Sequence, residues 1–105
     1  RPSEALDELR QAAELAPEQA RYAYTYAIAL NSAGRSADAI AVLQASLARH
    51  PDDRDTLRTL ATLSRDVEDF DAALGYAERL RSLAPDDPSV LRLVEELRRS
   101  ANLPR

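Results

Sequence analysis

Apolar and small residues recur along this chain at a fixed interval of 34 residues. Pro17, Pro51 and Pro85 mark the interval. Three further columns keep the same register: Ala5, Ala39 and Ala73; Leu6, Ile40 and Leu74; Tyr26, Leu60 and Val94. A period of this length is typical of helical repeat arrays, in which each unit buries its apolar face against the next unit. The period therefore predicts an all-α repeat fold.

Six helices are predicted within this register. The chain is rich in alanine and has only two glycines, which favours helix throughout. The expected helices cover residues 3–15, 19–33, 36–49, 53–66, 70–83 and 87–101. Ser3, Ser36 and Asp69 are expected to cap the first, third and fifth helices. Asp87 followed by Pro88 predicts the start of the sixth helix, because proline is favoured at the first helical position.

The register also predicts how the repeats are divided. Residues 1–17 correspond to the second helix of a truncated repeat, and residues 18–51 and 52–85 are two full repeats. Residues 86–101 correspond to a first helix with a polar outer face, as a C-terminal capping helix should have. Residues 102–105 are expected to be a frayed tail. The chain begins with Arg1, and we expect it to be the C-terminal domain of a longer protein.

The chain resembles the tetratricopeptide repeat family, whose units have 34 residues and two antiparallel helices with small residues at two close-packing points. These small positions are filled by Ala27 and Ala61, and by Ala39 and Ala73. Gly34 stands at the turn between helices, where the family often has glycine, and Glu68 replaces it one repeat later. The resemblance implies an alpha-alpha superhelix, or solenoid, of antiparallel helices. The RNA-binding pentatricopeptide type is a rival, but the spacing and the net charge of −4 oppose it.

Composition limits the chemistry further. The 105 residues suit a single domain, and no apolar run is long enough to cross a bilayer. The absence of cysteine excludes disulfides and thiolate metal sites. All basic residues are arginine, which together with the alanine content suggests a bacterial source with a GC-rich genome. We expect a soluble protein of the cytoplasm or the bacterial periplasm, with no nucleic-acid partner.

No catalytic, metal or cofactor site is expected. The single histidine, His50, precedes a repeat proline and has no converging partners, so a turn position is its simplest interpretation. The acidic pairs after Pro51 and Pro85 recur at helix starts, which favours capping over cation binding. No phosphate loop or nucleophile motif is present. The sequence therefore predicts that the chain is not an enzyme.

The resemblance places a peptide-binding groove on the first helix of each repeat. Carried onto this sequence, the groove residues are Tyr24, Ile28, Asn31, Arg58, Thr62, Arg65, Arg92, Glu96 and Arg99. The arginines recur seven residues apart on two successive first helices and suit carboxylates, so the predicted ligand is an acidic segment. The alternative is that these arginines are solvated and paired with Asp55, Asp66 and Glu96.

One subgroup of the family clamps the C-terminal carboxylate of chaperone tails with basic and asparagine residues at fixed positions. The matching positions here are Tyr24, Ile28, Thr59, Ser89 and Leu93. None is basic or asparagine, so a chaperone-tail clamp is rejected.

The predicted function is a non-catalytic interaction module that binds a peptide segment or partner helix in its groove. One alternative is a structural spacer or a self-associating array, with weak contacts through Leu6, Leu9 and Leu15 of the first helix. Another is an auxiliary region of a larger bacterial enzyme or multihaem electron-transfer protein, because residues 20–47 are similar to the C-terminal repeats of such cytochromes.

Overall fold

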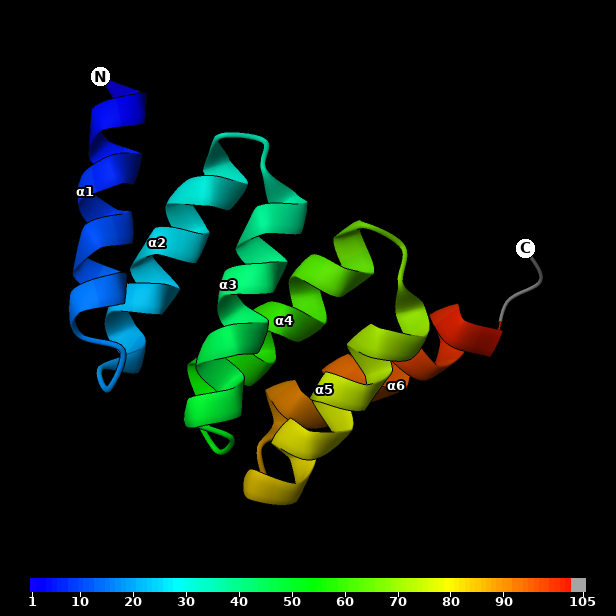
Figure 1. Cartoon of the computed structure of the whole chain (residues 1–105). Coiled ribbons are helices and arrows are strands. Elements are labelled where there is room, and N and C mark those ends of the chain that lie inside the picture. Colours follow the sequence, from blue (N-terminus) through cyan, green and yellow to red (C-terminus); the bar gives the residue numbers. More distant parts are fainter. Residues whose placement is uncertain (103–105) are drawn as a thin grey trace. The chain divides into compact units, whose positions relative to one another are not determined.

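The computed structural model describes residues 1–102, which form six α-helices and no strand (Figure 1). The helices are α1 (Pro2–Leu15), α2 (Ala20–Ser32), α3 (Ser36–Arg49), α4 (Arg54–Asp66), α5 (Phe70–Leu83) and α6 (Pro88–Asn102). Each predicted helix is confirmed. The predicted tail lies outside the described residues from position 103 onward. None of the helices in residues 1–102 is long and apolar enough to cross a membrane.

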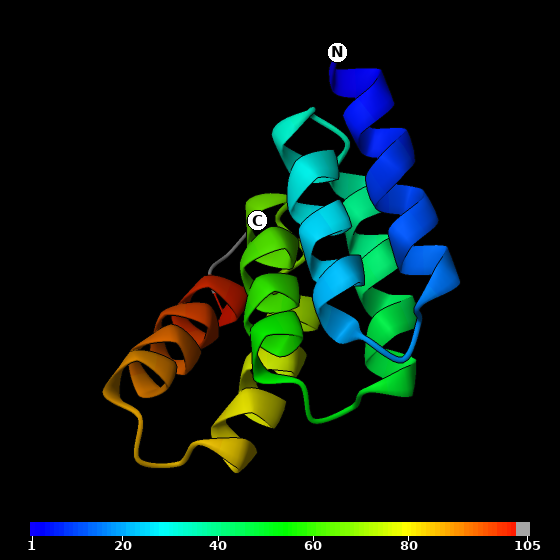
Figure 2. The same ribbon diagram turned by 90° about the vertical axis from the view of Figure 1, so that its left-hand side faces the viewer.

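The chain divides within α4 into two compact units. The first unit is residues 1–56, and the second begins at Leu57. The first unit contains α1, α2 and α3, which alternate in direction and lie side by side (Figure 2). Ala27 on α2 and Ala39 on α3 are fully buried, as are Leu30 and Leu43. Alanine at these two positions lets neighbouring helix backbones approach closely, which is the role that the repeat pattern predicts for them.

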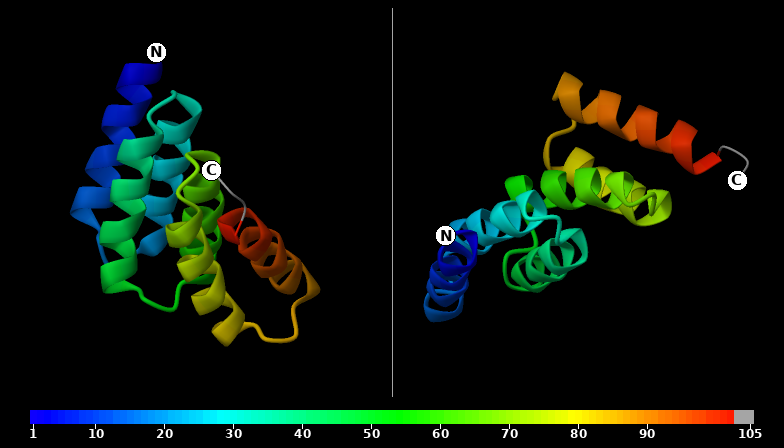
Figure 3. Two further views of the ribbon diagram at one scale, coloured as in Figure 1. Left: turned by 90° about the vertical axis from the view of Figure 1, so that its right-hand side faces the viewer. Right: turned by 90° about the horizontal axis from the view of Figure 1, so that it is seen from above.

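The second unit contains most of α4 together with α5 and α6, and α5 and α6 form an antiparallel pair (Figure 3). Its core joins small and large residues from all three helices: Ala61, Ala73, Ala77, Leu93, Val94 and Leu97. Leu74 and Tyr76 pack against this cluster. Three of these core residues, Ala61, Ala73 and Val94, therefore stand in columns that recur in the sequence.

Two turns between helices have the same backbone geometry. After α2, Arg35 N–H donates to Leu30 C=O at 2.9 Å and Gly34 N–H to Asn31 C=O at 3.0 Å. After α4, Asp69 N–H donates to Ser64 C=O at 2.8 Å and Glu68 N–H to Arg65 C=O at 2.9 Å. Both patterns are Schellman motifs, which require a left-handed residue after the helix.

The left-handed residues are Gly34, with φ of 79°, and Glu68, with φ of 64°. Glycine adopts this conformation without steric strain, whereas a residue with a Cβ does so at an energetic cost. The second turn therefore has the same backbone conformation as the first, although glutamate stands in the place of glycine.

Helix caps agree with prediction at acidic positions and differ at the serines. Asp69 accepts from Ala72 N–H at 3.3 Å, and Asp87 accepts from Ser89 N–H at 2.9 Å, so both caps are confirmed. The predicted caps Ser3 and Ser36 are wrong, because α1 is capped at Arg1 and α3 at Arg35 without side-chain hydrogen bonds. The tight Schellman turn places Arg35 at the cap, so Ser36 already belongs to the helix.

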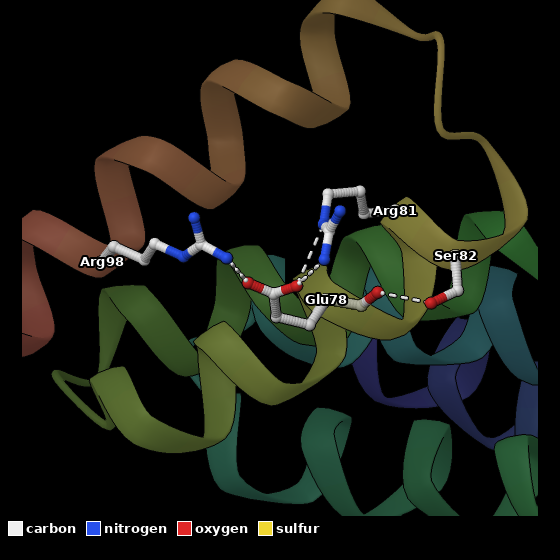
Figure 4. Close-up of polar contacts among 4 residues, drawn as sticks. All are labelled: Glu78, Arg81, Ser82 and Arg98. Atoms are coloured by element: carbon white, nitrogen blue, oxygen red, sulfur yellow. Dashed lines mark hydrogen bonds and ion pairs between the residues drawn. The ribbon is translucent and has the colours of Figure 1, made fainter.

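Glu78 joins the last two helices (Figure 4). Its carboxylate accepts from Arg81 at 2.8 and 3.0 Å and from Arg98 of α6 at 2.6 Å. The hydrogen bond from Arg81, followed by that from Arg98, lowers the pKa of Glu78 below its ordinary value. Ser82 Oγ also donates to the Glu78 carbonyl oxygen at 3.2 Å. This network attaches α6 to α5 at their solvent-facing edge.

Candidate peptide-binding surface

Two arginines of α4 reach across to α6 within the second unit. Arg58 donates to Ser89 Oγ at 3.3 Å, and Arg65 forms an ion pair with Glu96 at 3.4 Å. Each pair spans 31 residues, so two positions seven apart on α4 meet two positions seven apart on α6. A constant offset of this kind means that α4 and α6 run in the same direction with these faces aligned.

Arg58 and Arg65 are already engaged with acidic groups. Arg58 lies 3.8 Å from the Asp87 carboxylate, and Arg65 also contacts Asp66 at 3.4 Å. The Ser89 hydrogen bonds, with a smaller contribution from Arg58, lower the pKa of Asp87. The alternative of internally paired arginines therefore holds for Arg65 with Asp66 and Glu96, while the partner of Arg58 is Asp87 rather than Asp55.

Arg92 and Arg99 of α6 differ from Arg58 and Arg65 of α4. Both are exposed, and neither has an ion pair or hydrogen bond with another residue in the described range 1–102. They lie seven residues apart, two helical turns or about 10 Å, on one stripe with Glu96. Arg65 holds Glu96 from the side of α4. The α6 stripe thus presents the two unpaired guanidinium groups of Arg92 and Arg99 next to the paired guanidinium groups of Arg58 and Arg65 on α4.

The remaining predicted residues divide between this surface and the first unit. Thr62 is half-buried, and its hydroxyl donates to Thr59 C=O at 3.0 Å. Tyr24, Ile28 and Asn31 form a stripe on α2 of the first unit, where Asn31 Oδ1 accepts from Ser36 Oγ at 2.9 Å. Ile28 is 39% exposed.

Leu93, at one of the positions compared with the chaperone-tail clamp, belongs to the core of the second unit and is 8% exposed. It is thus unavailable to a ligand.

The partners of Arg58 were missed by sequence reasoning. Asp87 was assigned only to capping, yet its carboxylate caps α6 and also faces Arg58. The sequence carries a usable signal, because Ser89 and Glu96 stand at the same offset from Arg58 and Arg65. Helix capping and arginine pairing were treated as separate uses of an acidic residue, and here one carboxylate serves both.

The other candidate groups have structural partners. His50 Nε2 lies 3.0 Å from the Pro17 carbonyl oxygen, which can only accept, so Nε2 donates. This bond ties the end of α3 to the turn after α1. Within residues 1–102 no group of three or more histidine or acidic side chains is placed to hold a metal ion.

The family of the chain follows from its comparison with known proteins. A family model described as tetratricopeptide repeat matches residues 1–63 and 30–97, so nearly the whole chain is covered. The chain belongs to the tetratricopeptide repeat family, and its fold is the all-α fold of that family. Members of this family generally mediate protein–protein interactions.

A solved structure agrees with this assignment. The Sgt2 tetratricopeptide repeat domain from Aspergillus fumigatus superimposes with a TM-score of 0.79 at 20% identity, over 99% of this chain and 75% of that chain. At this identity the likeness concerns the fold alone. No curated protein matches the chain.

Proposed function

We propose that the second unit binds an acidic peptide segment along the exposed stripe of α6. The observation that carries the proposal is that Arg92 and Arg99 have no partner among the described residues, on a face where Arg58 and Arg65 are paired. Guanidinium groups hold carboxylates with two parallel hydrogen bonds. A ligand carboxylate at each of these arginines would complete the set of ion pairs on the surface.

The spacing of the arginines defines the ligand. About 10 Å separates positions seven apart on a helix. A polyproline II segment rises about 3.1 Å per residue and returns to the same face every three residues, so acidic residues at i and i+3 lie about 9 Å apart. We therefore expect an extended ligand with two acidic residues at this spacing. Glu96 lies between the arginines and would repel such a ligand, but its ion pair with Arg65 offsets part of that charge.

The ion pairs of Arg58 and Arg65 also affect how strongly this surface can bind a ligand. Both arginines are about a third or more exposed, and exposed ion pairs of this kind contribute little to stability. A ligand carboxylate can therefore replace Asp87 or Glu96 as a partner at small energetic cost. Arg58 and Arg65 would then strengthen binding after the first contacts with Arg92 and Arg99.

The test is a titration of a fluorescently labelled Glu-Pro-Pro-Glu peptide, followed by anisotropy at low salt. Replacement of Arg92 and Arg99 by alanine should weaken binding about tenfold or more, because each charged hydrogen bond contributes about 1.5–3 kcal/mol. The matched control is the double variant of Arg21 and Arg35 to alanine, which removes the same two positive charges from α2 and from the turn that follows it.

The control separates a local site from general electrostatics. Binding by the Arg21/Arg35 variant should stay within about twofold of the parent. An equal loss of affinity in both double variants would show that net charge alone explains the effect. Unchanged affinity in the Arg92/Arg99 variant would show that the peptide does not bind at the α6 stripe.

A further inference from the structure

A hollow of about 220 Å³ lies within the first unit, between α1, α2 and α3. Its walls are mostly apolar, and they include Ala13, Pro17, Ala23, Tyr26, Val42 and Ala45. Ala45 is exposed and the other five residues are half-buried. The hollow therefore opens to solvent, and a side chain from outside can contact its apolar walls.

The repeat indicates which kind of side chain this hollow lacks. Ala13 and Ala23 line it, and one period later the same columns carry Leu47 and Leu57. These two leucines are buried, with 6% and 0% of their surface exposed. Where the chain fills these columns it uses leucine, whereas the first copy of the columns holds small residues and leaves space.

The size of the hollow suits one leucine side chain. An apolar cavity of about 150 Å³ holds a benzene ring, which is larger than the isobutyl group of leucine. Sites for drug-sized molecules measure about 300–1,000 Å³ and exceed this hollow. Contact with alanine, valine and the tyrosine ring would stabilise such a side chain through burial alone, without a buried hydrogen bond.

The chain itself presents an exposed leucine that this hollow could cover. Leu15, the last residue of α1, is 84% exposed. The other exposed large apolar side chains within residues 1–102 are Val67, Leu91 and Ile28, at 49%, 43% and 39%. Because the free energy of burial scales with the apolar area removed from water, Leu15 gains most from being covered.

Unpaired charges of opposite sign stand beside these two features. Arg49 lines the hollow on the α3 side, is exposed and has no partner among the described residues. Glu18 lies in the turn after Leu15, is exposed and likewise has no ion pair or hydrogen bond within residues 1–102. The other charged residues of the hollow, Arg10 and Glu14, are paired with each other at 3.0 Å. A molecule that places Leu15 in the hollow can therefore bring Glu18 towards Arg49.

Leu15 does not fill the hollow of its own molecule. Arg10 and Glu14 line the hollow, and on a helix Leu15 points about 140° away from Arg10 and about 100° away from Glu14. The leucine must therefore come from another molecule. Because the projecting side chain and the hollow lie on different faces of α1, each copy could donate to one neighbour and accept from another, which is a heterologous contact.

We propose that the hollow binds Leu15 of a second copy of this chain, with Glu18 of that copy at Arg49, so that copies associate head to tail. A contact centred on one leucine is small, so the association is weak. Heterologous contacts that do not close into a ring form open chains, whose mass grows with protein concentration. The contact involves neither the α6 stripe nor the arginines of the second unit.

The test is a nuclear magnetic resonance titration at low salt. The receptor is isotope-labelled Leu15→Ser, which keeps the hollow but cannot donate the leucine, and the donor is unlabelled parent protein. We expect saturable shifts of the backbone amide signals of Val42 and Ala45. Unlabelled Leu15→Ser is the matched control donor and should cause no shift, whereas unlabelled Leu91→Ser should act like the parent. The absence of saturable shifts with the parent, or equal shifts with both the parent and Leu15→Ser, overturns the proposal.

Further changes locate the contact. In the receptor, Ala23→Leu introduces the residue of the next repeat and should weaken binding about tenfold or more, with helicity checked by circular dichroism. Arg49→Gln in the receptor, or Glu18→Gln in the donor, alters an exposed side chain and should weaken binding about threefold. The two charge changes together should weaken binding no more than either alone, because they remove the same ion pair. Unchanged affinity in a folded Ala23→Leu receptor, or additive losses from the charge changes, overturns the proposal.

Discussion

At the scale of single residues, the two Schellman turns show that a residue other than glycine can occupy the left-handed position. The turn after α2 uses glycine with positive φ, and the turn after α4 holds glutamate in the same conformation. A Cβ at Gly34 would meet no atom within 4 Å, so the strain at such a position comes from the backbone alone. The preference for glycine here is thus conformational rather than steric crowding by neighbours.

This comparison predicts that Glu68→Gly stabilises the protein. Relief of the left-handed strain should raise the free energy of unfolding by about 0.5–1 kcal/mol, partly offset by the greater freedom of glycine in the unfolded chain. For a domain of this size the midpoint of thermal unfolding should rise by several degrees. Gly34→Ala is the converse control and should lower the midpoint, and a fall in Glu68→Gly would refute the strain argument.

At the scale of helices, the repeat columns predict which residues pack between helices. A few charged side chains add hydrogen bonds and ion pairs from one helix to the next. Alanines predicted from the sequence pack in both units, and the acidic caps begin α5 and α6 as expected. Ser3 and Ser36 were assigned from residue preference alone, but helix starts also depend on how the preceding turn ends. The network around Glu78 could not be predicted, since Arg98 comes from the next helix.

The Glu78 network predicts a pH dependence of stability. The folded-state pKa of Glu78 is depressed, so its contribution is fully present above its unfolded value, near the ordinary 4.5, and is lost as pH falls through the lower folded pKa. Glu78→Gln should lower the free energy of unfolding by up to about 1 kcal/mol at neutral pH. Chemical unfolding between neutral pH and acid would measure both effects.

The control for this prediction is that the free energies of unfolding of the parent and of Glu78→Gln become equal at acidic pH. The difference in stability between them should shrink as the medium becomes acidic, because protonated Glu78 no longer attracts Arg81 and Arg98. A difference that stays constant down to strongly acidic pH would show that the effect of the substitution is packing rather than charge.

At the scale of the whole molecule, one apolar side chain stands out on α1. Leu15 is 84% exposed, while Leu6 and Leu9 of the same helix are half-buried. Of the three residues expected to mediate weak self-association, Leu15 thus presents the largest fraction of apolar surface. Its exposure keeps self-association as a prediction for the intact chain.

Sedimentation velocity at increasing protein concentration tests this prediction. The parent should show weak, concentration-dependent association that Leu15→Ser removes, because burial of a leucine contributes about 1.5–3 kcal/mol. Leu91→Ser on α6 is the matched control, since Leu91 is 43% exposed and lies in the other unit. Monomeric parent protein at all concentrations would assign Leu15 no role in assembly.

The sequence by itself determined the period, the six helices, the small packing positions and the family, because each depends on local helix formation and on regular recurrence along the chain. It also located the four arginines of the candidate surface. Only the tertiary structure decided which arginines are engaged, since Arg58 and Arg65 find partners on another helix. A hollow between α1, α2 and α3, lined by residues that include Ala13, Ala23 and Ser46, likewise depends on tertiary packing, because side chains of three helices meet there.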